Sequence, residues 1–405
     1  MIPVSEAVGI VIGRTPLLAA ERVALEDSLG RVLAEDVVAD SDLPPFDRAQ
    51  MDGYALRSED VRAVPARLRV VGEAAAGRGW RGRLGAGEAV RIMTGAPLPE
   101  GADSVQQVEV TREDADGRVV EVGRATEPGQ FYAVRASEIR AGETVLRAGE
   151  EVTAARAAVL ASFGYAEVAA RARPRVAVLT TGTELVPVGG RPGPDEIRDS
   201  NTYSLAAYAR LAGAEVERLP FAGDDPELLQ SLIAGAAARA DLLVLSGGVS
   251  MGRYDFTKAA LGALGAEIFF ERVALRPGKP TVFARLPGAR PVPVFGLPGN
   301  PVSVSVTFNL FARAALRAMQ GALEPALAEE HAVLARPARG AAERASYLPA
   351  VLRTGEDGRL LAEPLKWGGS SDFVAFARAT ALVIVPQGVR TADAGSVVKI
   401  VRLPA

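Results

Sequence analysis

Apolar runs alternate with amphipathic stretches along residues 174–321, and this alternation is the clearest pattern in the chain. The runs at 175–180, 242–245 and 292–295 are almost entirely apolar, as expected of strands that are buried on both faces. A shorter strand is predicted at 216–220. Strands that alternate with helices form a mainly parallel, doubly wound sheet, so this region is predicted to be an α/β domain.

Capping residues predict where the helices of this region begin. Asp and Asn side chains can accept the free N–H groups of a first helical turn, and proline is favoured at its first position. Such starts occur at four places, namely residues 199–201 (DSN), 224–226 (DDP), Asp255, and 300–301 (NP). We expect the last of these helices to end at Gly321.

Short alternating segments predict two β-rich parts on either side of this domain. Residues 42–141 contain such segments separated by glycines and charges, which is typical of a small β domain. Residues 322–405 contain further short strands, at 381–385 and 397–401, with turns between them, so we expect a small β-barrel.

Helical spacing of apolar residues predicts a separate body that flanks the first β part. Patterns at 4–14, 27–36 and 153–163 are helical, so residues 1–41 and 142–173 are expected to form a helical body in which the β domain of 42–141 is inserted. The fold class is therefore α/β multi-domain, with four domains in 405 residues.

Composition excludes several kinds of protein. A net charge of -3 gives no global field that would attract nucleic acid or an anionic membrane, and no apolar run has the length of a membrane span. The chain has no cysteine and a single histidine, His331, so thiolate sites, multi-histidine zinc sites and a Ser-His-Asp triad are not expected. Any metal would have oxygen ligands, which favours Mg²⁺. The N-terminus lacks the basic start of a signal peptide, and we expect a cytoplasmic protein.

Glycine-rich and cationic loops follow the predicted strands at 246–258 (SGGVSMGRYDFTK), 276–280 (RPGKP) and 297–303 (LPGNPVS). Glycine lets backbone N–H groups approach an oxyanion closely, and the N-terminus of a following helix contributes its dipole. Loops of this kind are therefore suited to phosphate binding. Only four lysines occur, and two of them, Lys258 and Lys279, fall in these loops. Chance explains this about as well as the use of a compact ammonium at a phosphate.

Three carboxylates lie at the same predicted strand ends. Glu184 follows the strand at 175–180 in the motif TTGTEL, and Asp224 and Asp255 stand at helix starts. Each could simply cap or begin a helix, where a negative charge is favourable. Ligands bind at the carboxyl ends of the strands in doubly wound sheets, so a functional role for Glu184 is favoured, and a capping carboxylate can also bind a metal.

Two further polar motifs lie in the predicted inserted β domain. MDGYA at 51–55 contains Asp52 before a glycine, and IMTGAPLPEGAD at 92–103 contains Thr94 before another. Asp52 alone would be read as a turn residue. The hydroxyl of Thr94 and the flexible N–H that follows it are suited to a tetrahedral oxyanion.

Taken together, these motifs closely resemble the molybdopterin molybdotransferase family, of the MoeA and gephyrin E-domain type. The N-terminal motifs matter, because MogA-type and CinA-type relatives share only the α/β domain. The resemblance implies four parts, namely a helical body, an inserted β domain, a MogA-like α/β domain and a C-terminal β-barrel. It also implies a homodimer whose active site lies between subunits. The implied reaction inserts molybdate into adenylylated molybdopterin and releases AMP, with Mg²⁺ as the metal.

The resemblance also assigns roles to residues. Catalytic roles fall on Asp52, Thr94, Glu184 and Asp255, and metal binding on Glu184, Asp224, Asp255 and Glu138. Substrate and phosphate binding fall on Gly247, Gly248, Ser250, Arg276, Lys279, Pro298, Asn300, Pro301, Arg135, Ser370 and Ser371. Molybdate is expected near Thr94 and Arg135, and tungstate is a chemically similar dianion. A contact with the molybdopterin adenylyltransferase is also expected.

Three departures from the family pattern motivate an alternative. Residues 131–138 read FYAVRASE, which keeps Arg135 but has Ala133 in place of the family's first arginine and Glu138 at the acidic position. Arg276 replaces the family's lysine, and the serine-rich tail segment around Ser370 is only partly similar. A non-catalytic pterin-binding or scaffold paralogue of the same fold is therefore the competing hypothesis.

Overall fold

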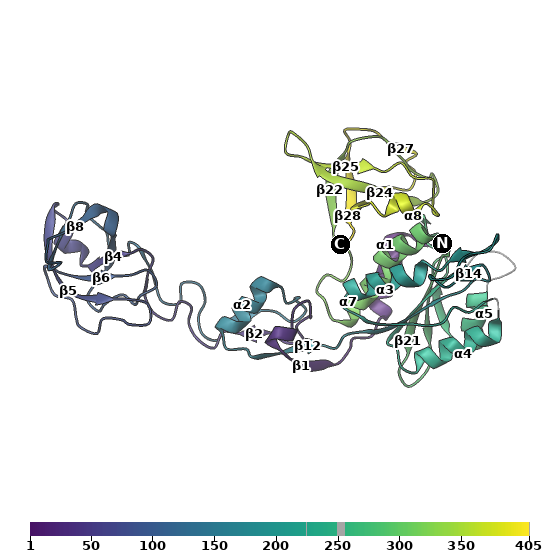
Figure 1. Ribbon diagram of the computed structural model, residues 1–405, viewed down its shortest axis with the longest axis horizontal. Coiled ribbons are helices and arrows are strands. Elements are labelled where there is room, and N and C mark those ends of the chain that lie inside the picture. Colours follow the sequence, from purple (N-terminus) through teal and green to yellow (C-terminus); the bar gives the residue numbers. More distant parts are fainter. Residues whose placement is uncertain (224, 249–255, 405) are drawn as a thin grey trace. The chain divides into compact units, whose positions relative to one another are not determined.

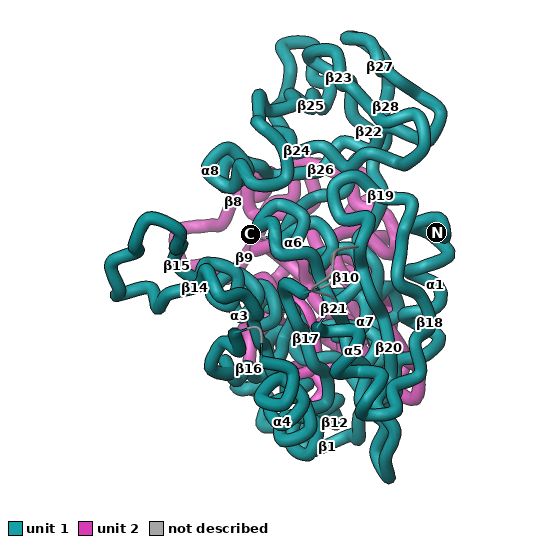
Figure 2. Tube along the Cα trace, turned by 90° about the vertical axis from the view of Figure 1, so that its right-hand side faces the viewer, with its two compact units in different colours: residues 1–35, 148–154, 167–405 teal, residues 36–147, 155–166 magenta. Residues whose placement is uncertain are grey.

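The computed structural model describes residues 1–223, 225–248 and 256–404. Of the predicted site residues, Asp224, Ser250 and Asp255 lie outside this part. The chain forms two compact units (Figure 2). Unit 1 comprises residues 1–35, 148–154 and 167–405, and unit 2 comprises residues 36–147 and 155–166. Each unit has hydrophobic cores of its own.

A six-stranded sheet forms the centre of unit 1 (Figure 1). Its order is β16 (Glu215–Arg218), β13 (Arg175–Thr180), β17 (Leu242–Ser246), β21 (Val292–Leu297), β20 (Val282–Leu286) and β18 (Glu267–Phe270). The first four strands are parallel, and β20 is antiparallel to both of its neighbours. The three predicted apolar runs are the central strands β13, β17 and β21, which are almost completely buried. The prediction of a mainly parallel α/β sheet is confirmed.

Helices cover both faces of this sheet. On one face lie α1 (Val4–Arg14), α3 (Asn201–Leu211) and the continuous stretch of α6 (Pro301–Thr307), a π-helical turn and α7 (Arg313–Met319). On the other lie α4 (Pro226–Ala237) and α5 (Phe256–Ala263). Alternate side chains of each strand point to opposite faces, so Val176 and Val178 join the first core and Ala177 and Leu179 the second. A fully buried Val or Leu stabilises the fold by about 1.5–3 kcal/mol, so both faces contribute.

The predicted helix starts are found where the structure describes them. The carboxylate of Asp225 accepts hydrogen bonds from the N–H groups of Glu227 and Leu228, and Pro226 is the first residue of α4. At α3 the carboxylate of Asp199 accepts from the N–H of Thr202 at 3.1 Å. Asn300 directly precedes α6, but its side chain does not cap that helix.

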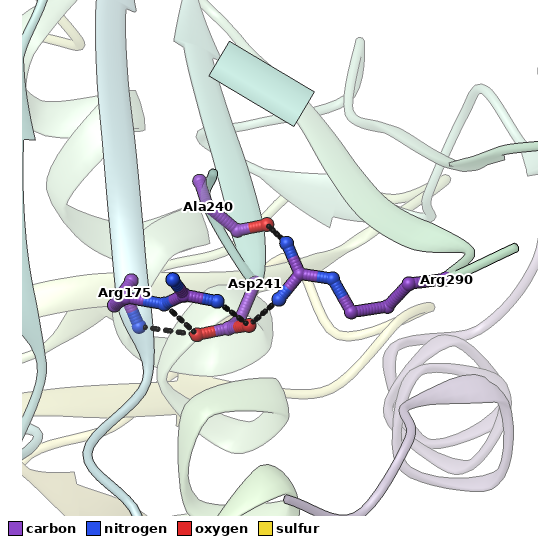
Figure 3. A network of polar contacts seen from close by, with 4 residues as sticks. All are labelled: Arg175, Ala240, Asp241 and Arg290. Atoms are coloured by element: carbon purple, nitrogen blue, oxygen red, sulfur yellow. Dashed lines mark hydrogen bonds and ion pairs between the residues drawn. The ribbon is translucent and has the colours of Figure 1, made fainter. Parts of the chain in front are cut away.

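Asp241 joins the amino ends of β13 and β17, the ends opposite to those that carry the polar motifs (Figure 3). Its buried carboxylate accepts hydrogen bonds from the backbone N–H of Arg175 at 2.9 Å and from its Nε and Nη2 at 3.0 Å. The guanidinium of Arg290 also binds this carboxylate and donates to the carbonyl of Ala240. Burial disfavours the ionised carboxyl, but the hydrogen bonds from Arg175 outweigh it and lower the pKa of Asp241.

A closed barrel of five strands follows the α/β domain. The strands are β22 (Glu329–Leu334), β24 (Ala345–Thr354), β25 (Leu360–Pro364), β26 (Ala381–Val385) and β28 (Val397–Arg402). The pairing of β24 with β26 closes the barrel, and β19 (Leu275–Arg276), a short strand from the preceding domain, runs parallel to β24. Closure leaves no free edge among these five strands, and the predicted C-terminal barrel is confirmed.

Unit 2 contains a second six-stranded sheet. Its order is β7 (Ser104–Gln107), β4 (Gly53–Leu56), β6 (Glu88–Ile92), β5 (Ala66–Ala74), β9 (Val119–Val122) and β8 (Thr111–Glu113). Small apolar clusters lie around Ala55, Val90 and Val105 and around Leu56, Ala89 and Val120, so side chains of the strands are buried on both faces. These short strands are those expected of the inserted β domain.

The helix predicted at 27–36 is wrong, whereas those at 4–14 and 153–163 are present as α1 and α2 (Ala154–Ser162). A single 3₁₀ turn ends at Asp27, and Val32 and Leu33 instead form β-bridges with Glu151 and Ala170. These pairings with distant segments satisfy backbone N–H and C=O groups that would otherwise have paired within a helix. Helix α1 packs into the core of the α/β sheet through Ala7 and Val11. The division into four domains stays a prediction.

Candidate active site

A cavity of about 930 Å³ lies at the carboxyl ends of the central strands of unit 1. The register places these ends side by side, because Thr180 of β13 is opposite Ser246 of β17, which is opposite Leu297 of β21. Seven of the predicted site residues line the cavity, namely Glu184, Gly247, Gly248, Pro298, Asn300, Pro301 and Ser371. Loops far apart in the sequence are thus assembled at one edge of the sheet, as expected for doubly wound folds.

Only glycine fits at the start of the loop after β17. Gly247 and Gly248 have φ of +93° and +63°, and a Cβ on Gly247 would lie 2.5 Å from the carbonyl oxygen of Thr181. A Cβ on Gly248 would lie 2.7 Å from Oγ1 of Thr257, whose hydroxyl donates to the carbonyl of Gly247 at 3.0 Å. The backbone is therefore held close to its neighbours and exposed to the cavity, which is what a phosphate-binding loop needs.

Asn201 links the ends of β17 and β21, although the sequence predicts it only as part of a helix start. Its Nδ2 donates to Oγ of Ser246 at 3.1 Å and to the carbonyl of Gly299 at 2.7 Å. The hydroxyl of Ser246 in turn donates to the carbonyl of Pro298 at 3.1 Å. An amide at the first residue of a helix was the only signal, and it did not distinguish a capping residue from a site residue.

Two oxygen atoms in this cavity wall have no hydrogen-bond partner among the described residues. They are Oγ1 of Thr180, a residue that is 1% exposed, and Oδ1 of Asn201. A buried polar atom without a partner costs about 1–3 kcal/mol, so native structures almost always satisfy it. Both oxygens are themselves buried, so they are unsatisfied groups beside the cavity and not part of its open surface.

The segment after Gly369 in the C-terminal region is attached to the start of α6. Nδ2 of Asn300 donates to Oγ of Ser370 at 3.0 Å, and the N–H of Val302 donates to the carbonyl of Ser370 at 3.0 Å. Ser371 and Phe373 then line the cavity. Phe373 was not predicted, because an aromatic residue in an amphipathic stretch normally indicates core packing.

Glu184 lies in a turn after β13, and no helix begins there. The alternative that it merely starts a helix is therefore wrong. The turn leads into β14 (Leu185–Val186), and the exposed carboxylate of Glu184 folds back over Gly182, close enough to fill the place of a side chain there. One carboxylate of the predicted metal set thus lines the cavity.

The two cations expected at the phosphate do not line this cavity in the structure. Arg276 is exposed in β19, and its Nη1 lies 3.4 Å from the carbonyl of Gly340. Lys279 is half-buried beside Pro280, which does line the cavity. Their phosphate-binding roles stay predictions.

In unit 2 the structure brings Asp52 and Thr94 together. Oδ1 of Asp52 accepts hydrogen bonds from the N–H of Thr94 at 2.6 Å and from its hydroxyl at 2.8 Å. The hydrogen bond from the backbone N–H of Thr94 makes the larger contribution to lowering the pKa of Asp52, and the hydrogen bond from its hydroxyl lowers this pKa further. The next residue, Gly53, passes so close to the carbonyl of Gln106 that a Cβ would overlap it. The carboxylate is thus ionised and fixed, with Oδ2 free of these bonds.

Residues 47–50 form hydrogen bonds with two motifs of unit 2, TGAP (94–97) and FYAVRASE (131–138). The N–H of Ala49 donates to the carbonyl of Ala96 at 3.0 Å, and the N–H of Gln50 donates to the carbonyl of Phe131 at 2.9 Å. TGAP and FYAVRASE therefore flank one segment of chain. Phe131 and Ala136 have φ of +59° and +60°, which is uncommon outside glycine. Such backbone is kept only where its surroundings determine it, and that is frequent at functional sites.

The charged residues of FYAVRASE are paired within unit 2. Nε of Arg135 donates to Oδ2 of Asp42 at 2.6 Å, and Arg48 lies 3.4 Å from Glu138. The guanidinium of Arg135 is largely exposed, whereas Asp42 is mostly buried. Hydrogen bonds from the N–H of Ala141 and from Arg135 lower the pKa of Asp42. Arg135 is therefore positioned by a carboxylate, with much of its guanidinium still open to solvent.

No group of three or more Asp, Glu or His that could hold a metal is found among the described residues. Glu184 supplies one oxygen donor at the cavity. Of the other three carboxylates of the predicted set, Asp224 and Asp255 lie outside the described part, and Glu138 lies in unit 2, where it pairs with Arg48. The chemistry of these donors fits Mg²⁺, which prefers carboxylate oxygens and keeps several waters. No helix in the described part is long and apolar enough to cross a bilayer.

Comparison with known proteins covers almost the whole chain. Three family models match: the MoeA N-terminal region (domain I and II) at residues 2–164, a probable molybdopterin binding domain at 177–318, and the MoeA C-terminal region (domain IV) at 331–403. A molybdopterin molybdenumtransferase of Bacillus subtilis (strain 168) is 36% identical over 98% of this chain and 93% of its own length. One of Nostoc sp. (strain PCC 7120) is 36% identical over 99% and 94%.

A solved structure agrees with these sequence matches. The molybdopterin biosynthesis MoeA protein of Pyrococcus horikoshii OT3 is 27% identical, with a TM-score of 0.84 over 100% of both chains. Both the N-terminal motifs and the α/β cavity thus fall within matched regions. The chain belongs to the MoeA family.

Proposed function

We propose that this protein is a molybdopterin molybdenumtransferase, which inserts molybdate into adenylylated molybdopterin and releases AMP. The observation that carries the proposal is the cavity at the ends of β13, β17 and β21. Gly247 and Gly248 line it with backbone, and a side chain at either position would clash with neighbouring atoms. Full-length relatives at 36% identity bear this name. The competing hypothesis of a non-catalytic paralogue has no observation of its own in the described part of the chain.

The cavity can bind and orient a phosphorylated substrate. The backbone after β17 offers a concave surface for an oxyanion, and the start of α6 adds a helix dipole. Asn201 keeps the loops after β17 and β21 in register through Ser246 and Gly299. A rigid binding surface of this kind stabilises charge in the transition state without reorganising at the moment of reaction.

Mg²⁺ is proposed as the metal, held by Glu184 with Asp224 and Asp255. When bound, it would neutralise charge that develops on the phosphoanhydride oxygens as AMP leaves. Glu184 holds an oxygen donor at the cavity wall, because the turn after β13 folds its carboxylate over Gly182. Replacing Glu184 by Gln keeps its size but removes the charge, so more Mg²⁺ should be required for half-maximal AMP release.

Asp52, Thr94 and Arg135 are proposed to act on the oxyanion substrate. Asp52 is ionised and fixed by two hydrogen bonds from Thr94, and so can orient a water or a metal. Arg135, fixed by Asp42, presents an exposed cation for molybdate or tungstate. Ala133 stands where the family has an arginine. We expect this difference to raise the anion concentration that the reaction requires, and not to abolish the reaction.

A homodimer is also proposed, on the basis of family membership. Closed two-fold pairing is the commonest oligomeric state of soluble proteins. Light scattering coupled to size-exclusion chromatography should give about twice the mass of the 42.2 kDa chain. A monomer with full activity would contradict the proposal.

Product analysis tests the proposed function. The protein is incubated with adenylylated molybdopterin, Mg²⁺ and molybdate, and the molybdenum bound to the pterin product is measured by mass spectrometry after protein removal. We expect stoichiometric insertion by the wild type and strongly reduced insertion by Glu184→Gln. Tight pterin binding without any molybdenum in the product would favour the non-catalytic paralogue.

A further inference from the structure

One aromatic ring stands in the wall of the active-site cavity. Phe373 is the first residue of α8 (Phe373–Phe376), it lines the cavity, and it is 50% exposed. It is the only aromatic residue among the described residues that line this cavity. The next residue, Val374, is 69% exposed and does not line the cavity.

Local hydrogen bonds hold the segment of backbone that carries this ring. The carboxylate of Asp372 accepts from the N–H of Gly368 at 2.8 Å and from the N–H of Ala375 at 3.2 Å. The hydrogen bonds of Ser370 to Asn300 and Val302 attach the same segment to the start of α6. At the other end of α8, Phe376 is buried in the main core of unit 1. The backbone that carries the ring is therefore anchored on both sides.

Phe373 differs from the other apolar residues of the wall in carrying an aromatic ring. A phenyl ring neither donates nor accepts ordinary hydrogen bonds, so what it offers a ligand is a flat apolar face. Elsewhere the wall offers the backbone after β17 and apolar side chains such as Leu185 and Ile197, none of them aromatic. A cavity of about 930 Å³ is large enough for a nucleotide-sized ligand. A ring face and an oxyanion loop together suit a phosphorylated heteroaromatic compound.

We propose that Phe373 stacks on a heteroaromatic ring of the substrate and sets the specificity of the cavity for it. This inference rests on the proposed function, whose substrate carries two such rings, the adenine and the pterin. Stacking on an aromatic side chain uses only the face of the ligand ring and works for any flat heterocycle. Phe373 is thus a specificity-determining residue that binds the part of the substrate remote from the reacting phosphoanhydride.

Binding measurements on three variants test the proposal. Phe373→Leu removes the ring but keeps an apolar side chain, Phe373→Tyr keeps the ring, and Val374→Ala is the matched control from the same helix. Affinity is measured by isothermal titration calorimetry for AMP, for ribose 5-phosphate, which lacks the base, and for adenylylated molybdopterin. Because Phe373 is half-exposed, each variant should fold, and circular dichroism checks this.

We expect Phe373→Leu to weaken binding of the stacked ligand by roughly fivefold or more, a value at the low end of measured stacking contributions. Phe373→Tyr and Val374→Ala should bind as the wild type does, and ribose 5-phosphate should not distinguish the variants. A loss seen with AMP would identify the adenine as the stacked ring, and a loss seen only with adenylylated molybdopterin would identify the pterin.

Equal affinities of wild type and Phe373→Leu for both AMP and adenylylated molybdopterin would overturn the proposal, as would a wild type that binds neither. These binding constants do not depend on turnover. A wild type that binds both ligands but releases no AMP would refute the proposed function and leave the stacking result intact.

Discussion

Replacing Asp241 by Asn should destabilise unit 1 without altering its active site. The carboxylate is 7% exposed and accepts three hydrogen bonds from Arg175 and one from Arg290 (Figure 3). Asn keeps the shape but presents one oxygen in place of two, removes the charge, and turns an amide N–H₂ group toward the cationic donors. The perturbation lies at the amino ends of β13 and β17, far along these strands from the cavity.

The size of the effect follows from what remains after the substitution. Breaking a buried ion pair typically costs about 3–5 kcal/mol when an unpaired charge is left buried. Here the side chains left behind are 52% exposed for Arg175 and 44% for Arg290, so water can solvate them. Loss of the carboxylate also removes its own cost of burial. We therefore expect a loss of about 2 kcal/mol, near the contribution of one charge-assisted hydrogen bond.

Urea unfolding followed by tryptophan fluorescence and circular dichroism measures this loss, with Glu217→Gln as the control. Glu217 forms two hydrogen bonds of 2.8 Å with Arg239, but both side chains are about half exposed, so the control should lose under about 1 kcal/mol. Equal losses in the two variants would refute the reasoning that burial of Asp241 makes the difference. Turnover of Asp241→Asn at a temperature where it is folded should equal that of the wild type.

The pH dependence gives a second check on Asp241. Its pKa is lowered in the folded protein, so its contribution is fully present above the ordinary carboxyl pKa of about 3.9 and is lost as the pH falls through the lower, folded value. The stability difference between wild type and Asp241→Asn should thus be constant at neutral pH and shrink in acid. A difference that grows in acid would contradict the sign of this shift.

Three further outcomes are expected. Asp52→Ala should fold normally, since Asp52 is exposed, but its turnover should fall by roughly 10²-fold. Unchanged turnover would mean that Asp52 serves only to form the turn. Thr94→Val removes one of the two hydrogen bonds that lower the pKa of Asp52, so NMR titration of that carboxyl should show a higher pKa than in the wild type, and an equal or lower value would count against the pairing. Burial raises the pKa of Tyr347 to about 12. The absorbance change near 295 nm that ionisation of Tyr347 causes is the difference between the titrations of the wild type and Tyr347→Phe. It should appear around pH 12 and not near pH 10.

The sequence was most informative where a pattern is local. Strands buried on both faces show as apolar runs, and the loops after them carry glycines because close backbone approach forbids a Cβ, as at Gly247. The helix predicted at 27–36 failed for the opposite reason. Its apolar residues Val32 and Leu33 are buried through pairing with chain segments more than 100 residues away, which no local period reveals.

Partners in the candidate site were the least predictable feature. Asp52 and Thr94 were both expected to act, but their direct hydrogen bonds across 42 positions follow from the register of β4 and β6. Asn201 and Phe373 reach the cavity from a helix start and from the C-terminal region. The sequence predicts the first only as part of a helix start and does not single out the second. Such residues can be recognised only once the strand ends are assembled.

Release of AMP in response to the oxyanion is the direct test of molybdate insertion by this protein. The wild-type protein is incubated with adenylylated molybdopterin and Mg²⁺, molybdate or tungstate is titrated, and AMP is quantified by chromatography. We expect saturable AMP release that requires the oxyanion, and the anion that saturates at the lower concentration is the substrate. AMP release that is absent, or that proceeds equally without either anion, would contradict this expectation.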